Sequence, residues 1–344
     1  MASLRLGLTQ PLPVLVEARY RAAKSASSLI FSPTELTAIR TNSGVPVGAP
    51  HNDSGLFQLR YCPALGKKPT PQSDSSPKKI DPFENPDKDL FITDVPKADP
   101  THFLILNKFP VIAQHFIIAT KLNKPQTRVL EEDDLDLTYA CLQAWSEQEA
   151  EGKSGKLFAF FNSGEHSGAS QPHRHIQFLP VERMVGSEAA PKWQPLLDMI
   201  AASKDPSELK LPFFYAWQPI PPDPTPEELH DLYLCLYAES AAAVRKYIRS
   251  NPGDLSLHDS EDGASPFSYN LGMTTDAMIM CPRRREGKVL QSDNGAELGF
   301  AGLNGTLLAG TLMVKWQEEW ELLKSKPSVL DDVLEAIGVP TAGI

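Results

Sequence analysis

Three side chains that can bind or attack phosphate alternate along one short stretch of the chain. In the segment HRHIQF, His173, His175 and Gln177 alternate with Arg174 and the apolar Ile176. Alternate residues of a β-strand share one face, so a strand here would set two imidazoles and a carboxamide in one row. Ile176 would then anchor the opposite face of the strand in the core.

A run of small residues just before the histidines could hold phosphate. Backbone N–H groups in such a turn can approach phosphate oxygens without steric obstruction. The run consists of Gly164, Ser167, Gly168, Ala169 and Ser170. The turn and the strand that follows it therefore predict a site where phosphate meets imidazole.

An imidazole beside a phosphate can act as a nucleophile. Its attack on an α-phosphorus forms a phosphoramidate, which a second acceptor then cleaves. The attacking nitrogen must carry a lone pair, while the other ring nitrogen donates a hydrogen bond that a backbone carbonyl commonly accepts. We assign this role to the central residue, His175, and expect His173 to orient it or to donate to phosphate. Gln177 is expected to hydrogen-bond a nonbridging or the bridging oxygen.

Two histidines two positions apart on a strand also occur by chance or as ligands of a metal ion. A zinc site would need a third ligand, and the nearest candidate is His166, within the turn. The small-residue turn and Gln177 favour the catalytic interpretation, and we assign no residue as a metal ligand.

Strand and helix patterns around this segment predict a mixed chain. Apolar and β-branched runs predict strands within residues 102–120, 156–164, 173–181, 212–220 and 268–283. Helical spacing of apolar residues predicts helices at residues 13–30, 131–150 and 226–250. This order predicts an α+β fold with an antiparallel sheet and flanking helices. We expect residues 1–190 to hold the histidine strand and residues 191–344 to complete the substrate site, with a soft boundary that allows one compact domain.

Composition excludes several classes of protein. A net charge of −10 argues against a nucleic-acid-binding protein, which would need a basic surface. The chain has no apolar run long enough for a membrane span, and we expect no signal peptide. Its four cysteines form no CxxC pair, which favours buried thiols in a reducing compartment. We expect a protein of the cytoplasm, with the nucleus as the alternative.

The histidine strand resembles the transferase branch of the histidine triad superfamily, in which glutamine replaces the last histidine of HxHxH. Further segments resemble the fungal diadenosine tetraphosphate phosphorylases, also called ATP adenylyltransferases, in order and spacing. These segments are CPALGKKP (62–69), LILNKFPVIAQH (104–115), FFNSG with SGASQ, SYNLGMTTD and the late LGFAGLNGTLLAG. The resemblance implies a monomeric, histidine-triad-like α+β fold. It also implies phosphorolysis of diadenosine tetraphosphate to ADP and ATP through an adenylyl-histidine, with Mg²⁺ or Mn²⁺ assisting on the polyphosphate.

The resemblance also implies roles for individual residues. Lys68 matches a phosphate-binding lysine, and Leu106 with Asn107 matches a pair that contacts the nucleoside. Positions that match the family's other phosphate-binding and substrate-binding residues are Asn162, Gly168, Ala169, Ser170, Gln171, Asn270, Leu271, Gly272 and, more weakly, Arg283. The chain departs from the family in Pro172, where many relatives carry an acid, and in SGAS, where SGSS is common. From the residues alone, Lys68 reads as part of a solvated loop, and His102 and His115 as hydrogen-bonded structural histidines.

Three other functions share these residues. A hexose-1-phosphate uridylyltransferase would use the same histidine on a different nucleotide, but the cysteine pairs typical of its metal sites are absent here. Gln177 opposes a hydrolase of the triad class. A nucleotide-sensing module would keep the binding residues without needing His175.

Overall fold

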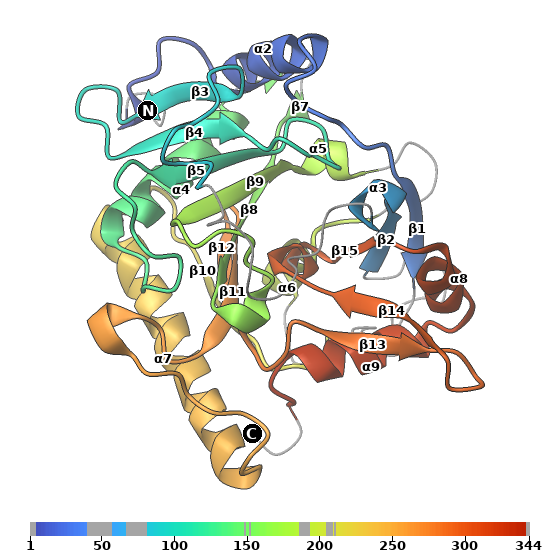
Figure 1. The fold of residues 1–344 in the computed structure, drawn as a ribbon. Helices are drawn as coiled ribbons and strands as arrows, with labels where there is room; N and C mark the ends of the chain where they lie inside the picture. The colour runs from blue at the N-terminus through green and yellow to red at the C-terminus, as the bar shows by residue number, and fades with distance from the viewer. Residues whose placement is uncertain are drawn as a thin grey trace.

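A single eight-stranded antiparallel sheet forms the centre of the computed structural model (Figure 1). The structure describes residues 5–39, 57–66, 81–147, 149–150, 153–185, 193–203, 209 and 211–341. In spatial order the sheet runs β10 (Ala216–Pro219), β12 (Ala277–Arg283), β11 (Ser268–Met273), β8 (Leu157–Ser163), β9 (His175–Pro180), β5 (Phe116–Thr120), β4 (His102–Leu106) and β3 (Phe91–Val95). Strands from both sides of residue 190 therefore share one sheet.

Side chains of the central strands alternate between two hydrophobic cores, as the period of a β-strand requires. Along β8, Leu157, Ala159 and Phe161 enter one core, while Phe158 and Phe160 enter the other. Each central strand is buried on both faces, which explains its nearly continuous apolar sequence.

Helices cover one face of the sheet. The first core includes α2 (Leu12–Ser25), α4 (Glu132–Ser146) and the long α7 (Pro226–Ser250). Helix α7 begins with a capping box, in which the Glu228 amide donates to the Thr225 hydroxyl and the Thr225 amide donates to the Glu228 carboxylate. Acids also occupy the first turn of α4, where the helix dipole favours negative charge.

The second core lies under smaller elements on the other face, with α8, β13 and β14 grouped away from α7 (Figure 1). A three-stranded sheet joins β1 (Glu35–Ile39), β2 (Phe57–Tyr61) and β15 (Thr311–Val314), and a hairpin joins β13 (Gly287–Gln291) and β14 (Glu297–Gly302). The short pair β6 (Glu149–Ala150) and β7 (Lys153–Ser154) follows α4. The other helices are α3 (Pro63–Gly66), α5 (Val181–Met184), α6 (Leu196–Ala202), α8 (Gln317–Ser325), α9 (Ser328–Ile337) and the 3-10 turns η1 (Glu165–Ser167), η3 (Glu261–Gly263) and η4 (Gly305–Ala309).

The α+β fold with an antiparallel sheet is confirmed, and the predicted strands and long helices are present within it. Helix α2 ends at Ser25 and α4 at Ser146, and β10 covers only part of residues 212–220. The strand predicted at residues 173–181 begins only at His175, so His173 lies before it, in an isolated bridge to Pro125. No helix within the described residues is long and apolar enough to cross a membrane.

Candidate active site

His175 opens β9 and is almost completely buried, with 3% of its surface exposed. Its Nδ1 donates a hydrogen bond to the backbone carbonyl of His173 at 2.7 Å, which leaves the lone pair on Nε2. Burial lowers the pKa of His175 to about 4, against the smaller opposing effect of that backbone hydrogen bond. The imidazole is therefore neutral near pH 7, in the tautomer that a nucleophile needs.

Beside the nucleophile, the side chain of Gln126 lies between the ends of β8 and β9. The β8–β9 register ends at Phe160 opposite Gln177, and its continuation places Asn162 opposite His175. There the Gln126 amide donates to the carbonyls of Asn162 at 2.9 Å and His175 at 3.2 Å. Its carbonyl accepts from the His175 backbone N–H at 2.8 Å. One buried carboxamide thus replaces the missing ladder bonds, and no local pattern in the sequence indicates this role.

His173 is held on both ring nitrogens. Nδ1 donates to the Asp81 carboxylate and Nε2 to the Thr120 carbonyl, each at 2.7 Å. The two partners, a carboxylate and a backbone carbonyl, fix the orientation of the ring. Phe83 packs against the rings of His173 and His175 at centroid distances of 5.5 and 5.1 Å. His173 thus orients the nucleophile through its backbone carbonyl. With both ring nitrogens bound to Asp81 and Thr120, its side chain has no donor left for phosphate in this structure, so the expected alternative role of donating to phosphate finds no support here.

A chain of hydrogen bonds orients the Gln177 carboxamide. Asn107 directly follows β4. Its side chain accepts a hydrogen bond from the Phe109 amide and donates one to His115 Nδ1 at 3.3 Å. His115 then carries its hydrogen on Nε2, which donates to Gln177 Oε1 at 3.0 Å. The expectation that His115 is hydrogen-bonded is confirmed. Because its carbonyl is already an acceptor here, Gln177 keeps its N–H₂ group for a ligand as far as the described residues are concerned.

Buried asparagines support the turn that precedes the histidines. Gly168 has φ 75°, and a Cβ there would lie 2.9 Å from the Leu303 carbonyl oxygen, so the position requires glycine. The Asn270 amide donates to the Ser167 carbonyl and to Asn162 Oδ1, both at 2.9 Å. The structure therefore brings the predicted residues Asn162, Gly168 and Asn270 together at one end of β8 and β11.

Arg283 lies fully buried behind Asn270 rather than at an exposed end of its strand. Its guanidinium donates to Asn270 Oδ1 and to the carbonyls of Ile337, Glu286 and Leu303. Burial lowers its pKa to about 10. These contacts hold Asn270 in place, and direct contact between Arg283 and a substrate stays a prediction.

The remaining predicted residues lie in different environments. Leu106, Leu271 and Gly272 are buried within strands. Ala169 and Ser170 are exposed on the turn, while Gln171 has a buried Oε1 with no hydrogen-bond partner. Lys68 lies outside the described residues, as does most of the loop around it.

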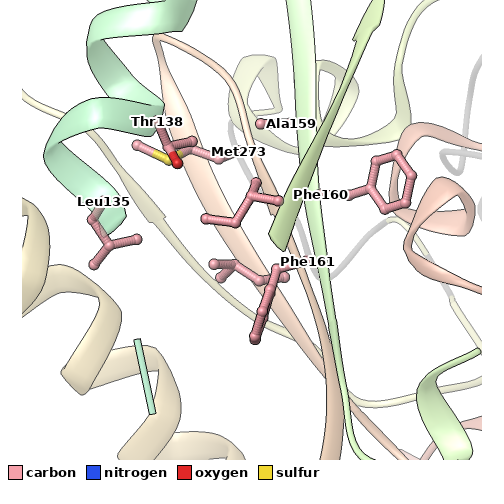
Figure 2. Close-up of a pocket in the computed structure, with 8 residues that line it drawn as sticks. Leu135, Thr138, Ala159, Phe160, Phe161 and Met273 are labelled. Carbon is pink, nitrogen blue, oxygen red and sulfur yellow. The ribbon is translucent and has the colours of Figure 1, made fainter. Parts of the chain in front are cut away.

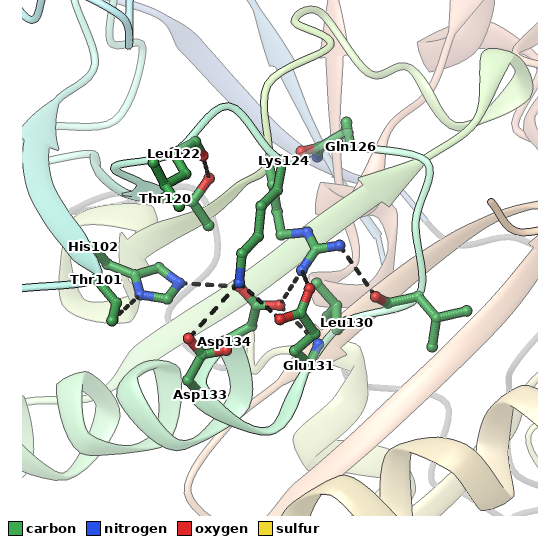
Figure 3. Close-up of polar contacts among 12 residues, drawn as sticks. Thr101, His102, Thr120, Leu122, Lys124, Gln126, Leu130, Glu131, Asp133 and Asp134 are labelled. Atoms are coloured by element: carbon green, nitrogen blue, oxygen red, sulfur yellow. Dashed lines mark hydrogen bonds and ion pairs between the residues drawn. The ribbon is translucent and has the colours of Figure 1, made fainter. Parts of the chain in front are cut away.

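On the opposite face of the histidine strand, Arg174 forms ion pairs with acidic residues at the start of α4. Arg174 is 1% exposed and donates to Asp134 at 2.7 Å and to Glu131 at 2.8 Å. Figure 3 shows His102 and Lys124 joining this network from the opposite side. Burial alone would raise the pKa of Asp134. The hydrogen bond from His102 and the charge of Arg174 outweigh burial and lower that pKa. The expectation that His102 is a hydrogen-bonded structural residue is confirmed.

A small apolar cavity lies between α4 and the sheet (Figure 2). Leu135 and Thr138 of α4 line it together with Ile176 and Met273. Its volume is about 10 Å³, close to that of one water-sized sphere. It is too small for a nucleotide and reflects imperfect packing, so it plays no part in the site.

Comparison with known proteins separates the alternatives that share this chemistry. The family described as "Ap4A phosphorylase N-terminal domain" matches residues 22–198, just over half of the chain. The family described as "ATP adenylyltransferase C-terminal domain" matches residues 209–340.

Individual relatives agree with these matches. Diadenosine 5',5'''-P1,P4-tetraphosphate phosphorylase 2 of Saccharomyces cerevisiae is 29% identical over 302 residues, covering 83% of this chain and 85% of the relative. Protein APA1 of the same yeast is 25% identical over 342 residues, covering 95% and 94%. The crystal structure of yeast Ap4A phosphorylase Apa2 has a TM-score of 0.74 at 22% identity, covering 97% of this chain and 99% of that one. That protein has also been solved with AMP and with Ap4A.

The structural likeness confirms the fold, and the two sequence families cover the histidine strand, the turn and the asparagine support between them. The chain therefore belongs to the Ap4A phosphorylase family, with the carboxyl-terminal domain of the ATP adenylyltransferases.

Proposed function

We propose that this chain cleaves diadenosine tetraphosphate by phosphorolysis, in two steps through His175. In the first step, Nε2 of His175 attacks the α-phosphorus, the bond to the bridging oxygen breaks, and ATP leaves. In the second step, phosphate attacks the adenylyl-histidine, the phosphorus–nitrogen bond breaks, and ADP forms. In the reverse reaction His175 takes AMP from ADP and releases phosphate, and ATP then accepts the AMP to form diadenosine tetraphosphate.

The state of His175 carries the proposal. A neutral imidazole with Nδ1 bound to a carbonyl has one nitrogen available for attack, and that nitrogen cannot be lost to protonation at neutral pH. When Nε2 bonds to phosphorus the ring gains positive charge. The His173 carbonyl then accepts a stronger, charge-assisted hydrogen bond, which stabilises the covalent intermediate.

Gln177 supports phosphate rather than water as the acceptor. Phosphate arrives ionised, whereas water needs a general base to become a nucleophile. With its carbonyl bound by His115, the carboxamide presents N–H groups, which can hold phosphate oxygens but cannot remove a proton. The intermediate would then persist until phosphate reaches it.

We propose that a divalent cation, Mg²⁺ or Mn²⁺, binds the polyphosphate and assists departure of ATP, and that Lys68 contacts the same phosphates. Asp81, the carboxylate that reaches the histidine strand, is already bound to His173, which supports a cation carried by the substrate. We also propose that the chain acts as a monomer. The protein and its polyphosphate substrate are both negatively charged, so local cations such as these are needed to offset their repulsion.

A labelling experiment tests the proposal. Diadenosine tetraphosphate labelled in the α-phosphates is incubated with enzyme without phosphate, and the protein is quenched in alkali, where a phosphoramidate survives. We expect labelled protein and one ATP per site, and release of ADP when phosphate is added. His175→Ala should form no labelled protein, whereas His230→Ala, a change on α7, should label normally. Labelled His175→Ala protein would refute the assignment, and binding without any label in the unaltered chain would favour a nucleotide sensor.

A further inference from the structure

Two histidines and a carboxylate meet beside the turn, although they are distant in sequence. Glu165 and His166 lie in η1, and His258 lies in the loop after α7. Glu165 Oε1 is 3.2 Å from His166 Nε2 and 3.8 Å from His258 Nε2. One ligand atom of each residue lies within 4.8 Å of the other two. We propose that these three side chains bind one divalent transition-metal ion of the zinc class.

The donor atoms suit such an ion. Two imidazoles and one carboxylate form a common ligand set for Zn²⁺, with bonds of about 2.0–2.2 Å, which places ligand atoms about 3.4 Å apart in a tetrahedron. The observed separations need only a small side-chain adjustment to reach that geometry.

Hydrogen bonds tie the backbone of both histidines to the same short segment, residues 266–268. The His166 amide donates to the Ser268 hydroxyl at 3.2 Å, and the His258 amide donates to the Pro266 carbonyl at 2.8 Å. Gly164 brings the turn close to Ser268, since a Cβ at Gly164 would lie 2.4 Å from the Ser268 hydroxyl oxygen. The backbone positions of the two histidines are therefore fixed before any ion arrives, which reduces the entropy lost on binding.

The ion would retain open positions. The side chains of His166 and His258 are 30% and 36% exposed, and that of Glu165 is 65% exposed, so water can complete the coordination shell. Mg²⁺ prefers oxygen ligands, so this site differs in kind from a cation bound to polyphosphate. Because His166 lies two positions before Gly168, a bound ion would stiffen the approach to the turn. Ion binding does not depend on the proposed phosphorolysis.

A second group of possible ligands is far less suitable. His102, Asp133 and Asp134 also lie close together. Arg174 and His102 already donate to Asp134, and Lys124 Nζ lies 3.9 Å from Asp133. Existing cations therefore occupy the position that a metal ion would need.

Metal titration tests the site without any activity measurement. Untagged protein freed of metal by a chelator is titrated with Zn²⁺ by calorimetry, and with Co²⁺ by its visible absorption. We expect one equivalent of either ion and a tetrahedral or five-coordinate Co²⁺ spectrum. His258→Gln and His166→Gln should each weaken binding more than about tenfold. Glu165→Gln, at an exposed position where folding is preserved, should weaken it as well.

His230→Gln supplies the matched control, because His230 is a partly buried histidine bonded to the Leu130 carbonyl on another part of the chain. Its Zn²⁺ affinity should equal that of the unaltered protein. Unchanged binding in the His166 and His258 variants, or no Zn²⁺ binding by the unaltered protein, would overturn the proposal. Equal loss in the His230 variant would overturn it too.

Discussion

Burial of His175 predicts that the chemical step survives in mild acid. With a pKa of about 4, roughly nine-tenths of His175 is neutral at pH 5. An ordinary histidine with a pKa near 6.5 would be only about 3% neutral at that pH. The rate of adenylyl transfer to the enzyme should therefore fall by no more than about twofold between pH 7.5 and 5, instead of about thirtyfold.

The assay isolates the first step. Rapid mixing of excess enzyme with diadenosine tetraphosphate, without phosphate, gives single-turnover release of ATP at each pH. This dinucleotide has no terminal phosphate, so its charge does not change between about pH 5 and 8. Carbon-13 labelling of the histidine rings gives the pKa directly, with the His175 signal identified by its loss in His175→Asn. A rate or a signal with its midpoint near pH 6.5 would refute the reasoning.

The same shift predicts a dependence of stability on pH. The pKa of His175 is lowered on folding, so its contribution to stability is complete above the unfolded value near 6.5 and is lost as pH falls toward about 4. For one group this amounts to about 2 kcal/mol between pH 7.5 and 5. Urea unfolding at the two pH values should show this difference in the unaltered chain, and a smaller one in His175→Asn.

Three substitutions test the surrounding residues. Gln177→His should lower phosphorolysis and raise the ratio of AMP to ADP at low phosphate; an unchanged ratio in a folded, active variant would mean that pocket closure excludes water instead. Gln126→Leu leaves three backbone groups at Asn162 and His175 without their partner and should cost at least about 2 kcal/mol in urea unfolding, while also lowering kcat. Lys68→Ala should raise KM for the dinucleotide about tenfold at physiological ionic strength, since a charged hydrogen bond contributes about 1.5–3 kcal/mol. Unchanged kinetics would mean that Lys68 is solvated and does not contact the substrate.

Local patterns were enough to predict the central strands, the long helices and the place of His175 and Gln177 on one strand, whereas His173 lies just before that strand. The period of two in β8 and β9 follows from the pleat of a strand, and the acids that start α4 follow from its dipole. Both are properties of neighbouring residues, which a sequence displays directly. The resemblance of the HRHIQ and NKFPV segments to a family supplied the reaction.

Contacts between distant residues were not predictable in this way. Asp81 and Phe83 reach His173 from the segment that precedes β3, and Gln126 reaches the backbone of His175 from the connection between β5 and α4. The burial of Arg283 was not predictable either. A run of three arginines suggests an exposed surface, yet the first of them is buried against carbonyl groups.

The sequence by itself determined which residues could do chemistry, because that depends on side-chain type and on spacing along one strand. Only the tertiary structure decided the charge and tautomer of His175, the direction of the Gln177 carboxamide and the meeting of His166 with His258. Each of these depends on burial or on a hydrogen-bond partner that is remote in sequence. Burial and partner geometry arise from packing of the whole sheet, and no local segment contains that information.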